Sequence, residues 1–315
     1  MVRVKAASLN HLDLWVRAGN PAYKISLPHI LGNDISGELA SFGPSTSSTF
    51  AIGDRVIVSP GISCWNCPNC RSGRDNLCES YRIIGADGGW GGHAQWAVVP
   101  ERNLLPVPKK DMTFEEAASY PLTFLTAYHM LKSLAKIKPG ETLLVLGSGS
   151  GVGAAAVQIG RALQARVVAA SSSSEKLERA GELGAQHLLL TEKGKLDKDA
   201  RRILGRCGAD VVFEHIGGEM FSSALRLLAP GGRIVTCGAT ADPLAKLDLR
   251  YIFFKELSVL GAKMGTLAEL KEVGGLFSDG TVAPVIDRTF PLSEAAQAHA
   301  YLSGRNQFGK VVLVP

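Results

Sequence analysis

The chain has 315 residues, of which 46% are apolar and 20% charged, a composition typical of a globular protein and not of a disordered one. Its net charge of +5 is mild and its basic residues are scattered, which argues against nucleic acid as a partner. The sequence shows neither an apolar run long enough to span a membrane nor the apolar core of a signal peptide. The length predicts two domains, and six cysteines with four of them clustered favour a reducing compartment, so we expect a cytoplasmic protein.

The first third of the chain shows short β segments separated by turns. Residues 55–58 follow a Gly-Asp turn and consist of an arginine and three apolar, β-branched residues, and residues 94–99 follow a glycine-rich bend. This pattern predicts an irregular, mostly antiparallel β domain over residues 1–121.

Four cysteines lie within one short loop of this domain, at Cys64, Cys67, Cys70 and Cys78. Four thiolates typically give zinc a closed, structural site with no position left for water or substrate. An iron–sulfur run would have three residues before its last cysteine and proline after it, whereas here seven residues precede the last cysteine and Glu79 follows it. We therefore predict one structural Zn²⁺ that holds the loop 64–78.

From about residue 111 the pattern changes to strands that alternate with helices. Thr113 precedes two glutamates and two alanines, which is typical of a capped helix start. Alternation of this kind predicts a parallel, doubly wound sheet over residues 122–262. Strand-like segments return in residues 263–315, which we expect to complete the first domain. The predicted strands are 142–146, 166–170, 210–213, 233–237, 282–286 and 310–314, and the predicted helices begin at 152, 174 and 220 or span 292–302.

A glycine-rich turn follows the apolar strand 142–146 and leads into an alanine-rich helix. Strand, glycine turn and helix are the context that makes such a motif indicate dinucleotide binding. The glycines let the backbone approach a pyrophosphate, and the helix N-terminus presents free N–H groups to it. The predicted cofactor-binding residues here are Gly147, Ser148, Gly149, Ser150, Gly151, Val152 and Gly153.

The end of the next strand, 166–170, indicates which nicotinamide cofactor binds. An Asp or Glu there favours NAD, because it accepts hydrogen bonds from the ribose hydroxyls. Here the strand leads to Ser171 and three further serines, with Lys176 close behind, which suits a 2′-phosphate. We favour NADP(H), with NAD(H) left open because Glu175 is near. The alternative is that these serines only cap the following helix, for which Ser174 is the candidate.

Several further segments carry a family pattern in addition to the cysteine loop and the glycine turn. They are Asn10-His11-Leu12-Asp13, Leu31-Gly32-Asn33-Asp34, Gly53-Asp54-Arg55-Val56, Ala229-Pro230-Gly231-Gly232 and Phe308-Gly309-Lys310-Val311-Val312. Over nearly its whole length the chain resembles the zinc-containing alcohol dehydrogenase and quinone oxidoreductase superfamily of medium-chain dehydrogenases. The resemblance implies a GroES-like catalytic domain, a Rossmann domain and a homodimer formed through the sheet edge near residues 258–262. It also implies an additional segment before the first strand; without it, the catalytic domain would expose an apolar sheet edge.

The resemblance does not extend to the ligands of a catalytic zinc. The positions that match those ligands hold Asn10, Asn33 and Leu122, and Asp34 stands where relatives have Glu. Zinc prefers thiolate, imidazole and carboxylate, so we expect no catalytic zinc. Three nearby histidines lack a shared spacing and are expected to be surface or core residues: His11, His29 and His93.

Asn10 and Asp13 instead resemble the Asn-x-x-Asp of the zinc-independent quinone oxidoreductases. The resemblance implies hydride delivery from an NADP(H) cofactor to a small enone, quinone or carbonyl compound. We predict that the Asn10 amide stabilises the negative charge that develops on oxygen, and that Asp13 orients the loop. Two alternatives stay open: a zinc-dependent alcohol dehydrogenase with substituted ligands, and a nucleotide-binding protein without catalytic activity.

Overall fold

The computed structural model describes residues 1–44, 46, 49–191 and 196–315. The chain forms two compact units, Met1–Leu125 with Met264–Pro315 (unit 1) and Thr126–Lys263 (unit 2). Within the described ranges, no helix is long and apolar enough to cross a membrane.

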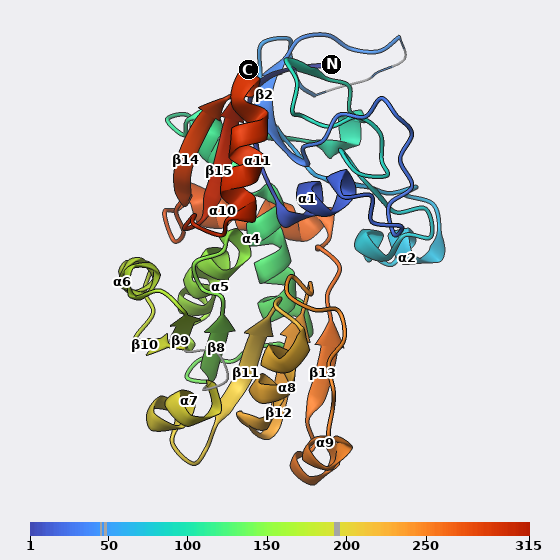
Figure 1. The fold of residues 1–315 in the computed structure, drawn as a ribbon. Helices are drawn as coiled ribbons and strands as arrows, with labels where there is room; N and C mark the ends of the chain where they lie inside the picture. Colours follow the sequence, from blue (N-terminus) through green and yellow to red (C-terminus); the bar gives the residue numbers. More distant parts are fainter. Residues whose placement is uncertain (45, 47–48, 192–195) are drawn as a thin grey trace. The chain divides into compact units, whose positions relative to one another are not determined.

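Unit 1 is built around a seven-stranded sheet with the order β14-β15-β1-β2-β3-β7, in which β6 also pairs with β1. Figure 1 labels β14, β15 and β2 of this sheet. All pairs are antiparallel except β14 with β15, so the predicted antiparallel-rich domain is confirmed. The strands are β1 (Val2–Ser8), β2 (Asp34–Leu39), β3 (Arg55–Val58), β6 (Trp96–Ala97), β7 (Leu104–Pro106), β14 (Ile286–Pro291) and β15 (Lys310–Val314), with β4 (Gly61–Ile62) and β5 (Arg82–Ile83) in a separate pair.

The core of unit 1 forms where apolar side chains of β1, β2 and β3 meet. Val2, Val4, Ile35, Val56 and Val58 are buried together, as the β-branched content of these strands favours. Because β1 lies between β15 and β2, the first and last strands of the chain are neighbours. This pairing brings residues from opposite ends of the sequence to one place.

The helices of unit 1 are short and lie around this sheet. Thr113 caps α3: its Oγ1 accepts a hydrogen bond from the Glu116 backbone N–H, and the Glu116 carboxylate accepts one from the Thr113 N–H. This capping box confirms the predicted helix start. The helical segments are α1 (His11–Arg17), α2 (Pro68–Arg71), η1 (Asp75–Leu77), η2 (Glu101–Asn103), α3 (Phe114–Ala118), α10 (Leu267–Ser278), η4 (Leu292–Glu294) and α11 (Ala295–Ser303), with α4 (Pro121–Tyr128) beginning in unit 1 and ending in unit 2.

Three predicted boundaries in unit 1 are wrong. The strand expected at 282–286 is β14, which begins only at Ile286 and carries charged residues because it is an edge strand. The strand expected at 94–99 pairs only at Trp96 and Ala97. The helix expected over 292–302 starts as the 3₁₀ turn η4 and becomes α-helical at Ala295.

Unit 2 contains a six-stranded sheet with the order β10-β9-β8-β11-β12-β13, in which every pair is parallel (Figure 1). The strand order reverses between β8 and β11, which is where doubly wound sheets bind ligands at the carboxyl ends of their strands. The predicted parallel sheet is confirmed. Its strands are β8 (Thr142–Leu146), β9 (Arg166–Ser171), β10 (His187–Leu190), β11 (Ala209–Glu214), β12 (Leu228–Thr236) and β13 (Ser258–Gly261).

Helices pack against this sheet through apolar side chains. α7 and α8 contribute Leu196, Ala200, Phe221 and Leu225 to one cluster with the buried strand residues. Strand β10 and helix α7 have no counterpart in the sequence prediction. The helical segments are η3 (His129–Leu134, a π-helix), α5 (Gly151–Ala162), α6 (Ser174–Glu182), α7 (Leu196–Leu204), α8 (Gly218–Arg226) and α9 (Leu249–Lys255).

Candidate functional site

The glycine turn of unit 2 connects β8 to α5 at the carboxyl end of the sheet. Gly147 has φ +62°, a left-handed conformation that favours glycine. The Ser148 N–H donates to the Ala170 carbonyl at 3.0 Å, which ties the turn to β9. Ser150 is the N-cap of α5, and its Oγ accepts a bond from the Gly153 N–H at 3.0 Å. The turn is therefore fixed on both sides, and the positive end of the α5 dipole lies at the carboxyl edge.

Two of the glycines lie close to other atoms, one to backbone and the other to a flexible side chain. A Cβ on Gly153 would lie 2.3 Å from the Gly147 carbonyl oxygen, so only glycine lets helix and turn pack this closely. A Cβ on Gly149 would lie 2.7 Å from Cδ of Lys176, so the Lys176 side chain passes beside the turn. The seven predicted residues thus form a backbone cradle of the kind that receives a pyrophosphate, with a basic side chain next to it.

The end of β9 places hydroxyl groups where an acidic residue would favour NAD. The Ser171 Oγ accepts a bond from the Ser173 N–H at 3.2 Å. The Ser173 Oγ accepts from the Lys176 N–H at 3.3 Å and caps α6, so the cap is Ser173 and the sequence prediction of Ser174 is wrong by one residue. Ser171 and Lys176 lie in one short segment at this edge, which fits their predicted role but does not test it.

Two residues at the end of β11 were missed by the sequence analysis. The Glu214 carboxylate is buried and accepts bonds from the N–H groups of Ile216 and Gly217, each at 2.6 Å, and from Thr236 Oγ1 at 2.9 Å. Burial raises the pKa of Glu214. His215 Nε2 lies 3.1 Å from Ser150 Oγ, and its ring lies over Gly147. The available signal was a buried strand ending in Glu214, followed by His215 and, one residue later, by two glycines.

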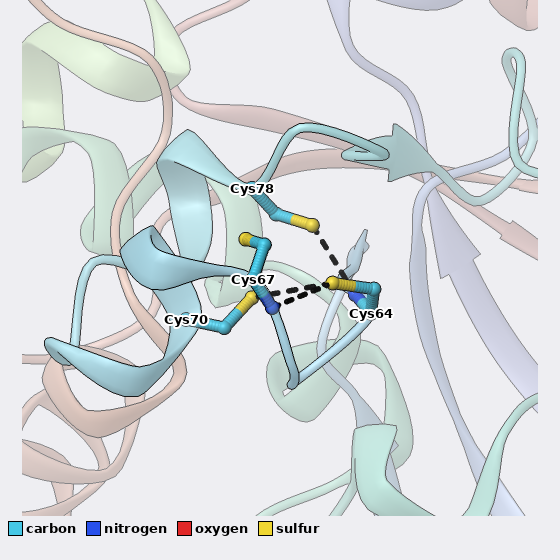
Figure 2. A group of neighbouring side chains, drawn as sticks. All are labelled: Cys64, Cys67, Cys70 and Cys78. Atoms are coloured by element: carbon cyan, nitrogen blue, oxygen red, sulfur yellow. Dashed lines mark hydrogen bonds between the residues drawn. The ribbon is translucent and has the colours of Figure 1, made fainter.

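In unit 1, the four predicted cysteines converge (Figure 2). Their sulfur atoms all lie within 4.8 Å of one another, and the Cys64 and Cys70 sulfurs are 3.9 Å apart. Four ligands at the usual Zn–S distance would be separated by about 3.8 Å in a regular tetrahedron. Within the described residues, these four cysteines form a group of side chains whose ligand atoms are close enough to hold one metal ion.

Backbone N–H groups donate hydrogen bonds to the sulfurs of Cys64, Cys67 and Cys78, which favours their thiolate forms. The Cys64 sulfur accepts from the N–H groups of Asn66 at 3.4 Å and Cys67 at 3.3 Å, and the Cys78 sulfur accepts from Cys64 at 3.2 Å. Backbone hydrogen bonds lower the pKa of Cys64 and bring that of Cys67 to about 6, whereas burial raises the pKa of Cys70 to about 12. The donor set and spacing therefore fit a structural Zn²⁺.

The cysteine loop is tied to α10 by a buried carboxylate. Asp75 lies between the third and fourth cysteines, and its two oxygens lie 3.3 and 3.1 Å from the backbone N of Leu267 at the start of α10. The Asp75 carbonyl accepts a bond from Ser63 Oγ at 2.8 Å. An ordered cysteine loop thus stabilises the N-terminus of a helix 192 residues further along the chain.

A second polar cluster in unit 1 contains Asn10. Its Nδ2 donates to Asp34 Oδ2 at 2.9 Å, and its Oδ1 accepts from Lys310 Nζ at 2.5 Å. Lys310 Nζ also lies 3.0 Å from Asp34 Oδ2, with side-chain exposures of 4% and 0% for the pair. The sequence analysis recorded Lys310 only as part of a motif. The signal was a lysine at the start of the otherwise apolar strand β15.

The other positions that match zinc ligands in relatives have different partners. Leu122 gives its backbone N–H to Asp34 Oδ1 at 2.8 Å, and Ser8 Oγ donates to Asp34 Oδ2 at 3.2 Å. Asn33 donates its Nδ2 to the Ile84 carbonyl at 2.7 Å. The Lys310 ammonium therefore contacts the same Asn10 and Asp34 oxygens that a metal ion would use as ligands. The donors present do not fit a catalytic zinc.

Asp13 lies in the first turn of α1, and both its oxygens meet backbone. Oδ2 accepts from the Asn10 N–H at 2.7 Å and Oδ1 from the Gly32 N–H at 3.0 Å, so it ties two loops together. Burial raises the pKa of Asp13 to about 6. His93 and His299 lie nearby with ring centroids 5.7 Å apart, and burial lowers the pKa of each to about 4. His11, His29 and His93 belong to no metal-binding group within the described residues.

Comparison with known proteins agrees with this architecture. Residues 1–109 match the model of the alcohol dehydrogenase GroES-like domain, and residues 151–279 match that of the zinc-binding dehydrogenase. The crystal structure of an NAD-dependent alcohol dehydrogenase is 42% identical, with a TM-score of 0.94 and coverage of 100% of this chain and 91% of that one.

Two further relatives differ in chemistry. Quinone oxidoreductase of Mus musculus is 29% identical over 100% of this chain and 88% of its own length. The structure of the 2-octenoyl-CoA carboxylase reductase CinF, in complex with NADP and 2-octenoyl-CoA, is 29% identical with a TM-score of 0.86, covering 99% of this chain and 78% of that one. The chain therefore belongs to the medium-chain dehydrogenase/reductase superfamily of oxidoreductases, whose members include alcohol dehydrogenases and quinone oxidoreductases.

Proposed function

We propose that the protein is an NADP(H)-dependent oxidoreductase that reduces a small enone, quinone or related carbonyl compound without a catalytic zinc. The observation that carries this proposal is the contact of the Lys310 ammonium with Asn10 Oδ1 at 2.5 Å and Asp34 Oδ2 at 3.0 Å. A divalent cation bound to the same two oxygens would lie next to the buried Lys310 ammonium, and Coulomb repulsion between the two positive charges opposes its binding.

Asn10 is the residue we assign to the chemistry. When bound, the reduced cofactor supplies a hydride to the far carbon of the conjugated bond, and a solvent proton completes the two-electron reduction. Negative charge develops on the conjugated oxygen as the hydride adds. The Asn10 side-chain nitrogen carries two N–H groups. Among the described residues, one of them donates to Asp34, so the other is available to the substrate oxygen. Asp13 holds the backbone N–H of Asn10 and thereby fixes the residue.

The cofactor assignment rests on the edge formed by β8, β9 and α6. The backbone cradle accepts a pyrophosphate, and Ser171 with Lys176 supplies a hydroxyl and a cation for the 2′-phosphate. NAD(H) is the alternative, which Glu175 in the first turn of α6 and the name of the 42% identical alcohol dehydrogenase favour. Fluorescence titration with NADPH and NADH decides between them: tighter binding of NADH refutes our choice.

We assign one structural Zn²⁺ to Cys64, Cys67, Cys70 and Cys78. Metal analysis of the purified protein should give one zinc per chain. Two tightly bound zinc ions per chain would instead support a zinc-dependent alcohol dehydrogenase with substituted ligands.

Oxidation of NADPH in the presence of quinones, enones and aldehydes tests the reaction itself. Turnover of at least one class by the wild-type protein supports the proposal, and Asn10→Ala should lower kcat about 100- to 1,000-fold with little change in cofactor affinity. Cofactor binding without turnover across the panel would favour a nucleotide-binding protein without catalytic activity.

The oligomeric state and location are also part of this proposal. We infer a homodimer formed through the edge strand β13, where Val259 is 43% exposed and, among the described residues, β12 is the one strand that pairs with it. Sedimentation velocity checks it, and a Val259→Lys variant should shift the protein toward monomer. We also propose a cytoplasmic location, which the six cysteines without a disulfide support, and cell fractionation would test it.

A further inference from the structure

The Lys310 side chain ends inside unit 1 with its charge buried. Its ammonium lies 2.5 Å from Asn10 Oδ1 and 3.0 Å from Asp34 Oδ2, and the lysine side chain is 4% exposed. The contact joins residues 300 positions apart, because β15 pairs with β1 next to the loop that carries Asn10. Lysine is almost never fully buried unless its ammonium is paired. Here the ammonium is paired with two polar side chains of the Asn10 cluster, Asn10 itself and Asp34.

The two partners of the Asn10 amide have opposite and fixed hydrogen-bonding character. Lys310 can only donate, and the Asp34 carboxylate can only accept. The amide therefore has one stable orientation, with Oδ1 toward Lys310 and Nδ2 toward Asp34. Reversing it would place an NH₂ group against an ammonium and a carbonyl oxygen against a carboxylate, with both contacts repulsive.

The backbone of Asn10 is held independently of this pair. Asn10 is the N-cap of α1, its N–H donates to Asp13 at 2.7 Å, and its carbonyl accepts from the Asp13 N–H at 3.0 Å. The rotation of the side chain about its two bonds is thus the remaining freedom of Asn10. Lys310 and Asp34 determine it.

We propose that Lys310 is a positioning residue for the reaction, whose ammonium fixes the Asn10 amide and strengthens its free Nδ2–H as a donor to the substrate oxygen. A cation on an amide oxygen draws electron density from its nitrogen, and hydrogen bonds in a chain polarise one another in the same sense. This inference rests on the proposed function, since it concerns the donor assigned there. It adds that a positive charge acts on the substrate through Asn10 and not by direct contact.

The test compares three variants with the wild-type protein and one matched control. Lys310→Met removes the ammonium, Lys310→Arg keeps a donor-only cation, and Asp34→Asn/Lys310→Met removes both buried charges. The control is Lys5→Met, because Lys5 forms a comparable pair with Glu38 at 3.1 Å between β1 and β2, with a side chain 33% exposed. Steady-state kcat and KM are measured with NADPH and the substrate found by the panel.

Lys310→Met should lower kcat about tenfold or more while KM for NADPH stays within about twofold, because an interaction that acts in the transition state is lost. Lys310→Arg should recover part of kcat, and Lys5→Met should match the wild type. The double variant should fold and stay slow, since replacing a whole buried pair is often neutral for stability. A double variant with wild-type kcat would overturn the inference.

A double-mutant cycle separates positioning from a general loss of structure. In the Asn10→Ala background, Lys310→Met should change kcat by less than about twofold, because there is no amide left to position. Full additivity of the two losses refutes the inference. If Asn10→Ala is slow and Lys310→Met is normal, only the positioning role fails. If Asn10→Ala keeps wild-type kcat, the proposed donor itself fails.

A readout without turnover covers the case in which the panel yields no substrate. With ¹⁵N-labelled asparagine, the Asn10 side-chain amide gives a proton pair assigned by its loss in Asn10→Ala. Lys310→Met should shift or broaden this pair, and Lys5→Met should not. An unchanged pair in Lys310→Met contradicts the inference whatever the substrate is.

Discussion

The stability of the Lys310→Met variant follows from what the substitution leaves behind. Methionine has a similar length but no charge, so the Asp34 carboxylate loses its cation while staying fully buried. Three donors to Asp34 survive: Asn10 Nδ2 at 2.9 Å, the Leu122 N–H at 2.8 Å and Ser8 Oγ at 3.2 Å. They compensate part of the charge but cannot neutralise it.

Removal of one partner of a buried ion pair costs about 3–5 kcal/mol, and we expect the lower end, about 3 kcal/mol, because of these three donors. An exposed pair such as Lys5–Glu38 contributes about 0–1 kcal/mol. At about 2–4 °C per kcal/mol, Lys310→Met should lower Tm by about 6–12 °C and Lys5→Met by less than about 4 °C.

Thermal unfolding followed by circular dichroism, with identical buffers and cofactor-free protein, measures both shifts. Midpoints are compared and not free energies, because two units need not unfold in one step. Asp34→Asn/Lys310→Met should recover at least half of the loss. Equal midpoints for Lys310→Met and Lys5→Met would refute the reasoning, since they would mean that the ammonium is not buried with Asp34 in solution.

Three other outcomes are expected. Chelation of zinc should lower Tm and, through Asp75, destabilise the N-terminus of α10, where hydrogen exchange should become faster before cofactor binding is lost. Unchanged exchange at the N-terminus of α10 would contradict the coupling between the cysteine loop and this helix. Lys176→Ala should weaken NADPH at least tenfold and NADH by less than about twofold in parallel titrations, and an equal loss for both would remove Lys176 from the 2′-phosphate site. Burial lowers the pKa of His93 and His299 from 6.5 to about 4, so between these values the unfolded chain binds protons that the folded chain does not, and stability should rise with pH. Burial raises the pKa of Asp13 from 3.8 to about 6, which cancels the contribution of one histidine, so these three groups together contribute a slope of about 1.4 kcal/mol per pH unit from pH 4 to 6. The raised pKa of Glu214 acts in the same direction as that of Asp13 and makes the observed slope smaller. Denaturant titrations measure the slope, and stability that falls as pH rises in that window would contradict the burial of the histidines.

The parts of the site that the sequence predicts are those built from neighbouring residues. The glycine turn is recognisable because strand, turn and helix N-terminus are contiguous, and the cysteine loop because all its ligands lie within residues 64–78. Both patterns depend on local backbone geometry, which short segments determine.

The parts that it does not predict depend on tertiary pairing. Lys310 meets Asn10 only because β15 lies beside β1, and no local pattern relates residues 300 positions apart. β14 was misplaced because its exposed edge position, and not its hydrophobicity, determines its residues. Glu214 was missed because a carboxylate at a strand end resembles an ordinary surface residue until its backbone donors are known.

The two polar centres of unit 1 explain why we propose a metal ion for one of them and not for the other. The cysteine loop has only the short helices α2 and η1, and residues 64–78 supply little apolar surface to hold them together, so thiolate–metal bonds would provide the stability that packing does not. The Asn10 cluster instead lies beside β1, β2 and β15, whose backbones are held by strand pairing. The buried negative charge of Asp34 in this cluster is balanced by the Lys310 ammonium. A lysine on a paired strand therefore balances the charge of one centre, whereas we propose an ion for the loop of the other.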